Sequence, residues 1–177
     1  IQKDCRQLTS KELLKASKGK KPDLIFGGPP CQGFSTIGDK LSSDPRNDLF
    51  SSLLRITEEL NPSFVIIENV KSITTMYDGR FSKWIQNKLD QLGYNVNLEV
   101  LNSADFGVPQ LRNRAFYIGT KIEGDYEFPK PTHGISSKKP YLTVGSAIND
   151  LINKGEEIPN HIALNHSEIV IDRYKLI

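Results

Sequence analysis

Asp23-Leu24-Ile25-Phe26-Gly27-Gly28, followed directly by Pro29-Pro30-Cys31-Gln32-Gly33-Phe34-Ser35, is the stretch that decides the fold. Its apolar half predicts a buried strand over residues 23–27, and the glycines and prolines behind it predict a sharp turn. Open α/β sheets carry their chemistry at such strand ends. Because two prolines fix the backbone before Cys31, we expect a rigidly presented thiol, which is a candidate nucleophile. The alternative is a structural cysteine, since free cysteines are often small buried hydrophobes.

The chain beyond this stretch alternates between helical and strand patterns. It predicts a helix over residues 49–60 that Asn61-Pro62 ends, a strand over 63–68, and a helix over 81–92 that Gly93 caps. This order predicts parallel strands. Two period-two segments over 94–100 and 114–119 predict an antiparallel end to the sheet. The fold class is therefore α/β, with a mostly parallel sheet.

The two ends of the chain carry weaker signals. Thr9 and Glu12 form a capping-box pattern for a short helix that ends near Gly19, and a basic loop follows. That loop either contacts phosphate or is a solvated face. Residues 123–140 predict a loop and residues 144–151 a short helix. His161 and His166 have no cysteine or carboxylate at ligand spacing, so we expect no metal site.

Composition sets broad limits on the class of protein. The 177 residues, 37% of them hydrophobic, suffice for one α/β domain, and no apolar run is long enough to cross a membrane. Lys and Arg total 23 against 21 for Asp and Glu, an excess too small to indicate a nucleic-acid partner. Two cysteines and no secretory signal favour a reducing, cytoplasmic location, which would keep Cys31 reactive.

Four blocks of sequence, in order, carry a family resemblance. They are Pro-Pro-Cys-Gln-Gly-Phe-Ser at 29–35, Asp-Pro-Arg-Asn-Asp-Leu-Phe at 44–50, Glu-Asn-Val at 68–70 after a β-branched strand, and Gly-Val-Pro-Gln-Leu-Arg-Asn-Arg at 107–114. Each alone is weak, but together they resemble the DNA (cytosine-5)-methyltransferases of prokaryotic type. The resemblance covers nearly the whole chain and implies a Rossmann-like methyltransferase core, of which this chain is the middle portion.

The resemblance implies methyl transfer from S-adenosylmethionine to carbon 5 of a cytosine flipped out of double-stranded DNA. Cys31 would add to C6 of the ring, since carbon 5 is a poor nucleophile until that bond forms. Glu68 would donate a hydrogen bond or proton to N3, the alternative being a capping or surface acid. The resemblance also implies DNA methylation in a prokaryotic cytoplasm, near the nucleoid, either in restriction–modification or in an orphan role.

Supporting positions follow from the same blocks. Arg112 and Arg114 alternate on an extended segment, so they point to one side and either hold a phosphate or base carbonyl with Glu68 or form an ordinary salt bridge. They could also favour the Cys31 thiolate. The remaining positions would support the substrate or tie down loops. These are Gln32, Ser35, Asn69 and Gln110.

Matches to cofactor-lining positions are fewer. Asp4 and Cys5 match residues that contact the adenine of S-adenosylmethionine, and Pro30 and Leu49 match other positions of that pocket. The family's glycine-rich loop is not in this sequence. Residues 1–151 are thus expected to form the middle of the catalytic domain, and 152–177 to lead toward a target-recognition region.

Several alternatives stay open at this point. Three explanations of the missing family blocks are open. The sequence is a version cut from the full enzyme, one part of a naturally split enzyme with a partner chain, or a piece of a longer protein. In each case we expect it to be inactive alone. The substrate alternative is transfer RNA, which one branch of the family methylates, although the Gln-Gly-Phe-Ser loop favours DNA. The alternative of another class is a catalytically silent subunit that binds DNA.

Overall fold

The structure is a computed structural model that describes residues 1–30, 47–124, 126–135, 137–152, 154–155, 157–162 and 165–176. It divides into two compact units, Ile1–Tyr141 and Leu142–Ile177. This division lies before the boundary predicted at residue 151, and the functional division of the chain stays a prediction. The first unit contains the sheet.

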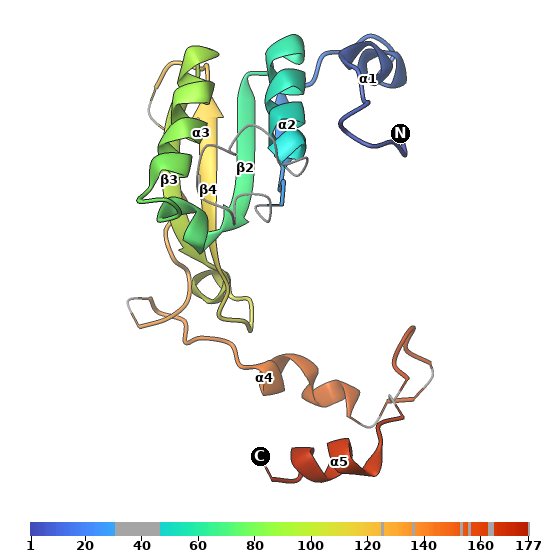
Figure 1. Ribbon diagram of the computed structural model, residues 1–177. Coiled ribbons are helices and arrows are strands. Elements are labelled where there is room, and N and C mark those ends of the chain that lie inside the picture. The colour runs from blue at the N-terminus through green and yellow to red at the C-terminus, as the bar shows by residue number, and fades with distance from the viewer. Residues whose placement is uncertain are drawn as a thin grey trace. The chain divides into compact units, whose positions relative to one another are not determined.

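Four strands form one mixed sheet in the order β1-β2-β4-β3 (Figure 1). They are β1 (Leu24–Gly27), β2 (Phe64–Val70), β3 (Asn95–Asn102) and β4 (Asn113–Thr120). β1 and β2 are parallel, whereas β4 is antiparallel to both β2 and β3. The predicted α/β class and the antiparallel end of the sheet are confirmed. β4 returns between β2 and β3, which brings the end of the 107–114 block beside the Glu-Asn-Val block.

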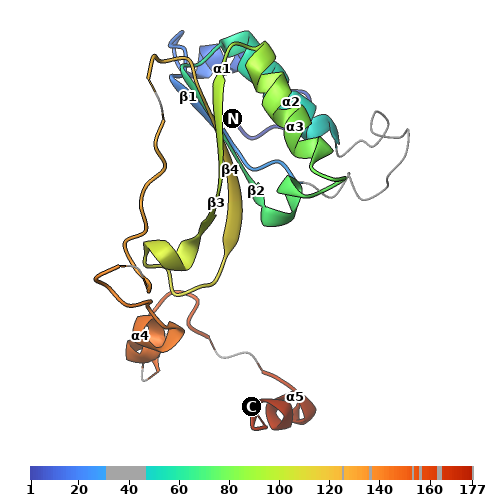
Figure 2. The ribbon, with the colours of Figure 1, turned by 90° about the vertical axis from the view of Figure 1, so that its left-hand side faces the viewer.

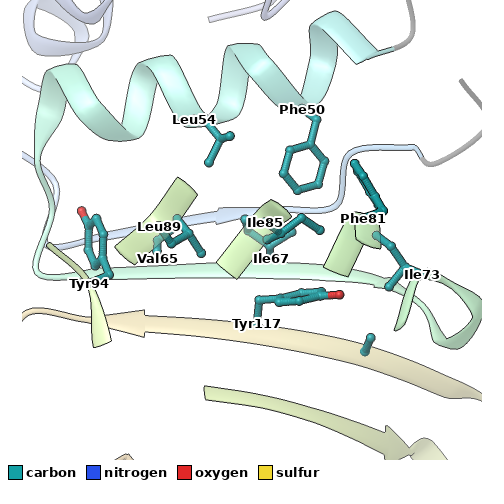
Figure 3. Close-up of a cluster of buried hydrophobic side chains, with 11 residues drawn as sticks. Phe50, Leu54, Val65, Ile67, Ile73, Phe81, Ile85, Leu89, Tyr94 and Tyr117 are labelled. Carbon is teal, nitrogen blue, oxygen red and sulfur yellow. The ribbon is translucent and has the colours of Figure 1, made fainter. Parts of the chain in front are cut away.

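Two helices, α2 (Asn47–Leu60) and α3 (Arg80–Gln91), cover one face of this sheet (Figures 1 and 2). Their apolar residues recur at helical spacing, so each helix buries one stripe. Figure 3 shows the resulting core, in which side chains of both helices meet those of β2 and β4. The fully buried members include Phe50, Ile85, Leu89, Val65, Ile67 and Tyr117. This layer holds β2 and β4 rigidly beneath the helices.

β1 corrects one prediction. The sequence predicted a buried strand, but the side chains of Leu24 and Phe26 are 47% and 63% exposed. β1 is the outer strand of the described sheet. Among the described residues, helix α2 packs on the face of β1 that carries Gly27, whereas Leu24 and Phe26 are on the other face. On the Gly27 face, Leu53 of α2 lies so close that a Cβ at Gly27 would meet its Cδ2 at 2.9 Å. An unbroken apolar run does not reveal which face of a strand is covered.

The predicted capping box at the N-terminus is confirmed. Helix α1 (Ser10–Ala16) begins with the Thr9 hydroxyl accepting from the Glu12 N–H, while the Glu12 carboxylate accepts from the Thr9 N–H at 3.0 Å. Lys3 donates to the same carboxylate at 2.6 Å. Hydrogen bonds from Lys3 and then from Thr9 lower the pKa of Glu12 to about 2. After the helix, Gly19 adopts a φ of +82°.

Short elements complete the chain. The 3₁₀ helices among the described residues are η2 (Lys71–Thr74), η3 (Ser103–Phe106) and η4 (Asn149–Leu151). In the second unit, α4 (Val144–Ile148) and η4 occupy the predicted helix, and α5 (Glu168–Tyr174) is a helix that the sequence analysis missed. Within the described residues, no cluster of three or more His, Cys, Asp or Glu could hold a metal ion. None of the helices described is both long and apolar enough to cross a membrane.

Candidate active site

A pocket of about 230 Å³ opens where β1 and β2 end and β4 begins. Its walls come from three segments that lie far apart in the sequence but that the strand pairing brings together. They are Gly28, Pro29 and Pro30 after β1, Glu68, Asn69 and Val70 at the end of β2, and Arg112 and Arg114 at the start of β4. Five residues that the sequence analysis singled out, from three different blocks, therefore line it: Pro30, Glu68, Asn69, Arg112 and Arg114.

The register of the sheet explains this convergence. Gly27 pairs with Ile67 in the parallel ladder, so the turn after β1 lies beside Glu68. Val70 pairs with Arg114 in the antiparallel ladder. Carboxyl ends of parallel strands are where open α/β sheets bind ligands. Here Arg114 of β4 and Arg112, just before that strand, add two cations to that edge.

Glu68 and Arg114 form an ion pair inside the pocket. Arg114 Nε donates to Glu68 Oε1 at 2.9 Å, and the two side chains are 27% (Glu68) and 21% (Arg114) exposed. They are diagonal neighbours on one face of the sheet, because Phe116 lies directly opposite Glu68. The other carboxylate oxygen, Oε2, would be 3.2 Å from a Cβ at Gly28. Glycine at position 28 thus leaves room for the carboxylate in the pocket.

Asn69 faces the opposite way and binds the turn that precedes Cys31. Its side-chain Nδ2 donates to the Pro29 carbonyl at 2.8 Å, and its Oδ1 accepts from the Val70 N–H at 2.9 Å. The residue is only 5% exposed, so the amide is committed to backbone partners. Of the two roles predicted for Asn69, holding the loop is the one that this geometry favours.

Arg112 enters the pocket differently from Arg114. Its residue is exposed, and within the described part of the chain its side chain forms no ion pair. Its backbone is tightly held, however, because its N–H donates to Asn102 Oδ1 at 3.1 Å and its carbonyl accepts from the Ser103 N–H at 3.0 Å. The two arginines share a pocket, as predicted, yet only Arg114 is anchored through its side chain.

Comparison with known proteins shows where this arrangement belongs. The sequence model of the C-5 cytosine-specific DNA methylases matches residues 1–177. The chain belongs to that family.

Curated relatives and solved structures agree with this assignment. Type II methyltransferase M1.HphI of Haemophilus parahaemolyticus is 40% identical over all of this chain and 48% of its own length. Type II methyltransferase M.AquIA of Picosynechococcus is 36% identical over 99% of this chain and 79% of its own. A crystal structure of a proposed prophage-encoded DNA modification methyltransferase (E. coli) shares 29% identity, with a TM-score of 0.65 over 84% of this chain and 40% of that one. The chain thus spans about half the length of the first of these relatives.

Other residues expected for a C-5 cytosine methylase lie away from the pocket or outside the described residues. Cys31, Gln32 and Ser35 belong to the second group. Gln110 is exposed in the loop before β4, where its N–H donates to the Val108 carbonyl at 2.7 Å, and it does not line the pocket. Two of the residues predicted to support the substrate lie in the described part of the chain, Asn69 and Gln110. Asn69 lines the pocket, and Gln110 does not.

Of the four predicted cofactor residues, only Pro30 lines the pocket. Hydrogen bonds from Arg6 hold the Asp4 carboxylate and lower its pKa to about 2. The Cys5 carbonyl accepts from Arg55 Nη2 at 3.4 Å, which ties this segment to α2, the helix that carries half-buried Leu49. Asp4, Cys5 and Leu49 do not line the pocket.

The sequence analysis gave no role to three residues in or beside the pocket. Gly28 and Val70 line the pocket, and Asn102 Oδ1 accepts a hydrogen bond from the Arg112 N–H. The signal for Asn102 was available, since asparagine followed by Ser at a strand end is a frequent N-cap pattern. The contact itself joins residues ten apart across a hairpin and has no local pattern.

Proposed function

We propose that this protein transfers a methyl group from S-adenosylmethionine to carbon 5 of a cytosine in DNA, with Cys31 as the nucleophile. The observation that carries the proposal is the pocket in which the Glu68–Arg114 ion pair lies beside Pro30, the residue that directly precedes Cys31. Membership of the C-5 cytosine-specific methylases supports it. The relatives named type II methyltransferases favour a role as the modification enzyme of a restriction–modification pair.

Cys31 starts the reaction. Its thiolate forms a bond to C6 of the cytosine, and the electron pair of the C5–C6 double bond moves into the ring, which makes carbon 5 nucleophilic. Carbon 5 then gains the methyl group, and the donor that loses it leaves as a neutral thioether. A water molecule takes the C5 proton, the electrons of the C5–H bond restore the C5–C6 double bond, and the thiolate leaves C6. Asn69 supports this step by fixing the Pro29 carbonyl two residues before the thiol.

Glu68 stabilises the base while its electrons shift. Negative charge develops at N3 when the thiolate adds. A proton carried on Oε2 of the Glu68 carboxyl, and donated to N3 as a hydrogen bond or by full transfer, would lower the barrier and leave a carboxylate paired with Arg114. Arg114 holds Oε1 and thereby leaves Oε2 for the base. A catalytic carboxyl needs this fixed orientation, since misplacement by about 1 Å can cost about 10²-fold in rate.

Arg112 and the loop residues hold the nucleotide. The Arg112 guanidinium is a planar donor that suits a phosphate or a base carbonyl. No carboxylate of the described residues forms an ion pair with it. Gln32, Ser35 and Gln110 would contact the substrate or tie down its loops. The nucleotide must leave the duplex to reach this pocket, a step that costs a few kcal/mol.

The described residues fit part of a site for S-adenosylmethionine. Asp4 presents an ionised, partly exposed carboxylate that can accept from an adenine amino group, and Leu49 and Pro30 supply apolar surface. Arg55 ties the Cys5 carbonyl to the helix of Leu49, which keeps these elements together. When bound, the cofactor supplies an electrophilic methyl group.

The chain spans about half the length of M1.HphI. We propose that segments beyond these 177 residues, in the same or a partner chain, complete the cofactor pocket and the DNA-reading surface. Isolated residues 1–177 should then transfer no methyl group, and addition of the flanking sequence that its gene encodes should restore transfer. Efficient transfer by residues 1–177 alone would show that this division is wrong.

Trapping tests the proposed chemistry directly. The protein, expressed with any flanking sequence of its gene, is incubated with S-adenosylmethionine and a duplex that carries 5-fluorocytosine. Fluorine at carbon 5 cannot leave as a proton does, so the bond between Cys31 and C6 should persist and shift the protein on a denaturing gel. The same duplex with cytosine should give no lasting complex. Cys31→Ala should abolish the adduct, and an adduct that survives this substitution would refute the assignment.

A further inference from the structure

Asn102, the last residue of β3, accepts two backbone hydrogen bonds with one side-chain oxygen. Its Oδ1 accepts from the Ala104 N–H at 3.4 Å, as the N-cap of η3, and from the Arg112 N–H at 3.1 Å. Ser103 completes the contact, since its N–H and its hydroxyl donate to the Arg112 carbonyl at 3.0 and 3.2 Å. Both polar backbone groups of Arg112 are therefore held by residues 102–103.

This contact matters because, among the residues that the structure describes, nothing comparable holds the Arg112 side chain. Arg114 is oriented by its ion pair with Glu68, whereas the Arg112 side chain forms no ion pair within the described residues. The direction in which the Arg112 guanidinium leaves the backbone therefore depends on the backbone contact. Since Arg112 lines the pocket, that contact sets where a cation meets the substrate.

We propose that Asn102 is a positioning residue, whose Oδ1 fixes the backbone of Arg112 so that its guanidinium faces the nucleotide in the pocket. This inference rests on the proposed methyl transfer and adds to it a residue that touches neither substrate nor cofactor. The requirement is for one acceptor within reach of two N–H groups. Asparagine and aspartate meet it, and alanine does not.

The loop has other contacts that would keep it folded without Asn102. Gly107 adopts a φ of +84°, its N–H donates to the Ala104 carbonyl, and the Val108 N–H donates to the Ser103 carbonyl, both at 3.2 Å. These bonds close η3 independently of the asparagine side chain. Loss of Asn102 should thus loosen Arg112 rather than unfold the hairpin.

The test compares Asn102→Ala and Asn102→Asp, each with and without Arg112→Ala, in the protein carrying any flanking sequence of its gene. Asn95→Ala is the matched control, because Asn95 is an exposed asparagine at the other end of β3. Three quantities are measured: kcat and KM for methyl transfer to DNA, melting temperature, and amide hydrogen exchange of a peptide that contains Arg112.

Asn102→Ala should speed exchange in that peptide and lower kcat by about 10- to 100-fold, with little change in melting temperature. Asn102→Asp should recover most of both losses, and Asn95→Ala should match the wild type. In the Arg112→Ala background, Asn102→Ala should cause no further loss, because its effect acts through that arginine.

Two results would overturn the inference while leaving the proposed function intact. One is an unchanged kcat despite faster exchange at Arg112, and the other is an equal loss of kcat with and without the arginine. Wild-type protein that transfers no methyl group to DNA would instead overturn the proposed function, and this inference with it.

Discussion

Replacement of Glu68 by glutamine separates a catalytic role from a structural one. Glutamine keeps the size and shape of the side chain and still has an oxygen for Arg114 Nε, which lies 2.9 Å from Glu68 Oε1. What it loses is the charge and the ability to deliver a proton to the base. The substitution therefore leaves the pocket intact and removes one chemical step.

The expected magnitudes of the two effects differ widely. Acid–base assistance is worth about 10²–10⁴ in turnover, which corresponds to about 3–5 kcal/mol of barrier at about 1.4 kcal/mol per tenfold change. The ion pair is 21–27% exposed, so its contribution to folding is at most about 1 kcal/mol. For a chain of this size that is a fall of about 2–4 °C or less in melting temperature.

Glu99 provides a matched control. It lies on β3 across Phe116 from Glu68, on the same face of the sheet and at the same rung of the ladder, but it is exposed and outside the pocket. Glu99→Gln should leave methyl transfer unchanged. The rate is measured with labelled S-adenosylmethionine under single-turnover conditions. Full methyl transfer by Glu68→Gln, or an equal loss in both variants, would refute the role assigned to Glu68.

Three further predictions follow from individual contacts. Gly28→Ala should lower kcat by about 10-fold, measured in the same assay, because its Cβ would press on Glu68 Oε2 at 3.2 Å. Tyr117→Phe should leave kcat unchanged but cost about 1 kcal/mol of unfolding free energy in denaturant titration, since the buried Tyr117 hydroxyl donates to Ser82 Oγ at 2.9 Å. An NMR titration of Glu12 should give a midpoint near pH 2, and because this pKa lies below its ordinary value of 4.5, the stabilisation by the cap should persist above pH 4.5 and vanish as pH falls through about 2.

Local patterns were enough to predict most elements of the first unit and part of the pocket. Helical spacing located α2 and α3, and Gly93, at a φ of +83°, ends the second of these as expected. The position of Glu68 at the end of an apolar strand placed it at the carboxyl edge of the sheet, where the structure has it. These inferences succeeded because each depends on neighbours within one turn or one strand.

What the sequence did not reveal depends on long-range pairing. The exposure of Phe26 follows from the outer position of β1, and the different anchoring of the two arginines follows from partners on other strands. Period and propensity carry no information on such partners.

Helix α5 was missed for a local reason. It has only seven residues and no buried ones, so no strong apolar stripe marks it.

The order of the strands is the link between fold and chemistry in this protein. Because β4 lies between β2 and β3, the ladder places Arg114 opposite Val70 and diagonal to Glu68. A slip of one residue in this antiparallel register would turn Arg114 to the helix-covered face and leave the Glu68 carboxylate without its cation. The β4–β3 hairpin then fixes Arg112 from the other side through Asn102. The start of β4 and the residue before it thus bring two cations to the pocket, each held in its own way. Their variants should fail differently: loss of Arg114 should disorder the Glu68 carboxyl, whereas loss of Asn102 should misplace the Arg112 guanidinium.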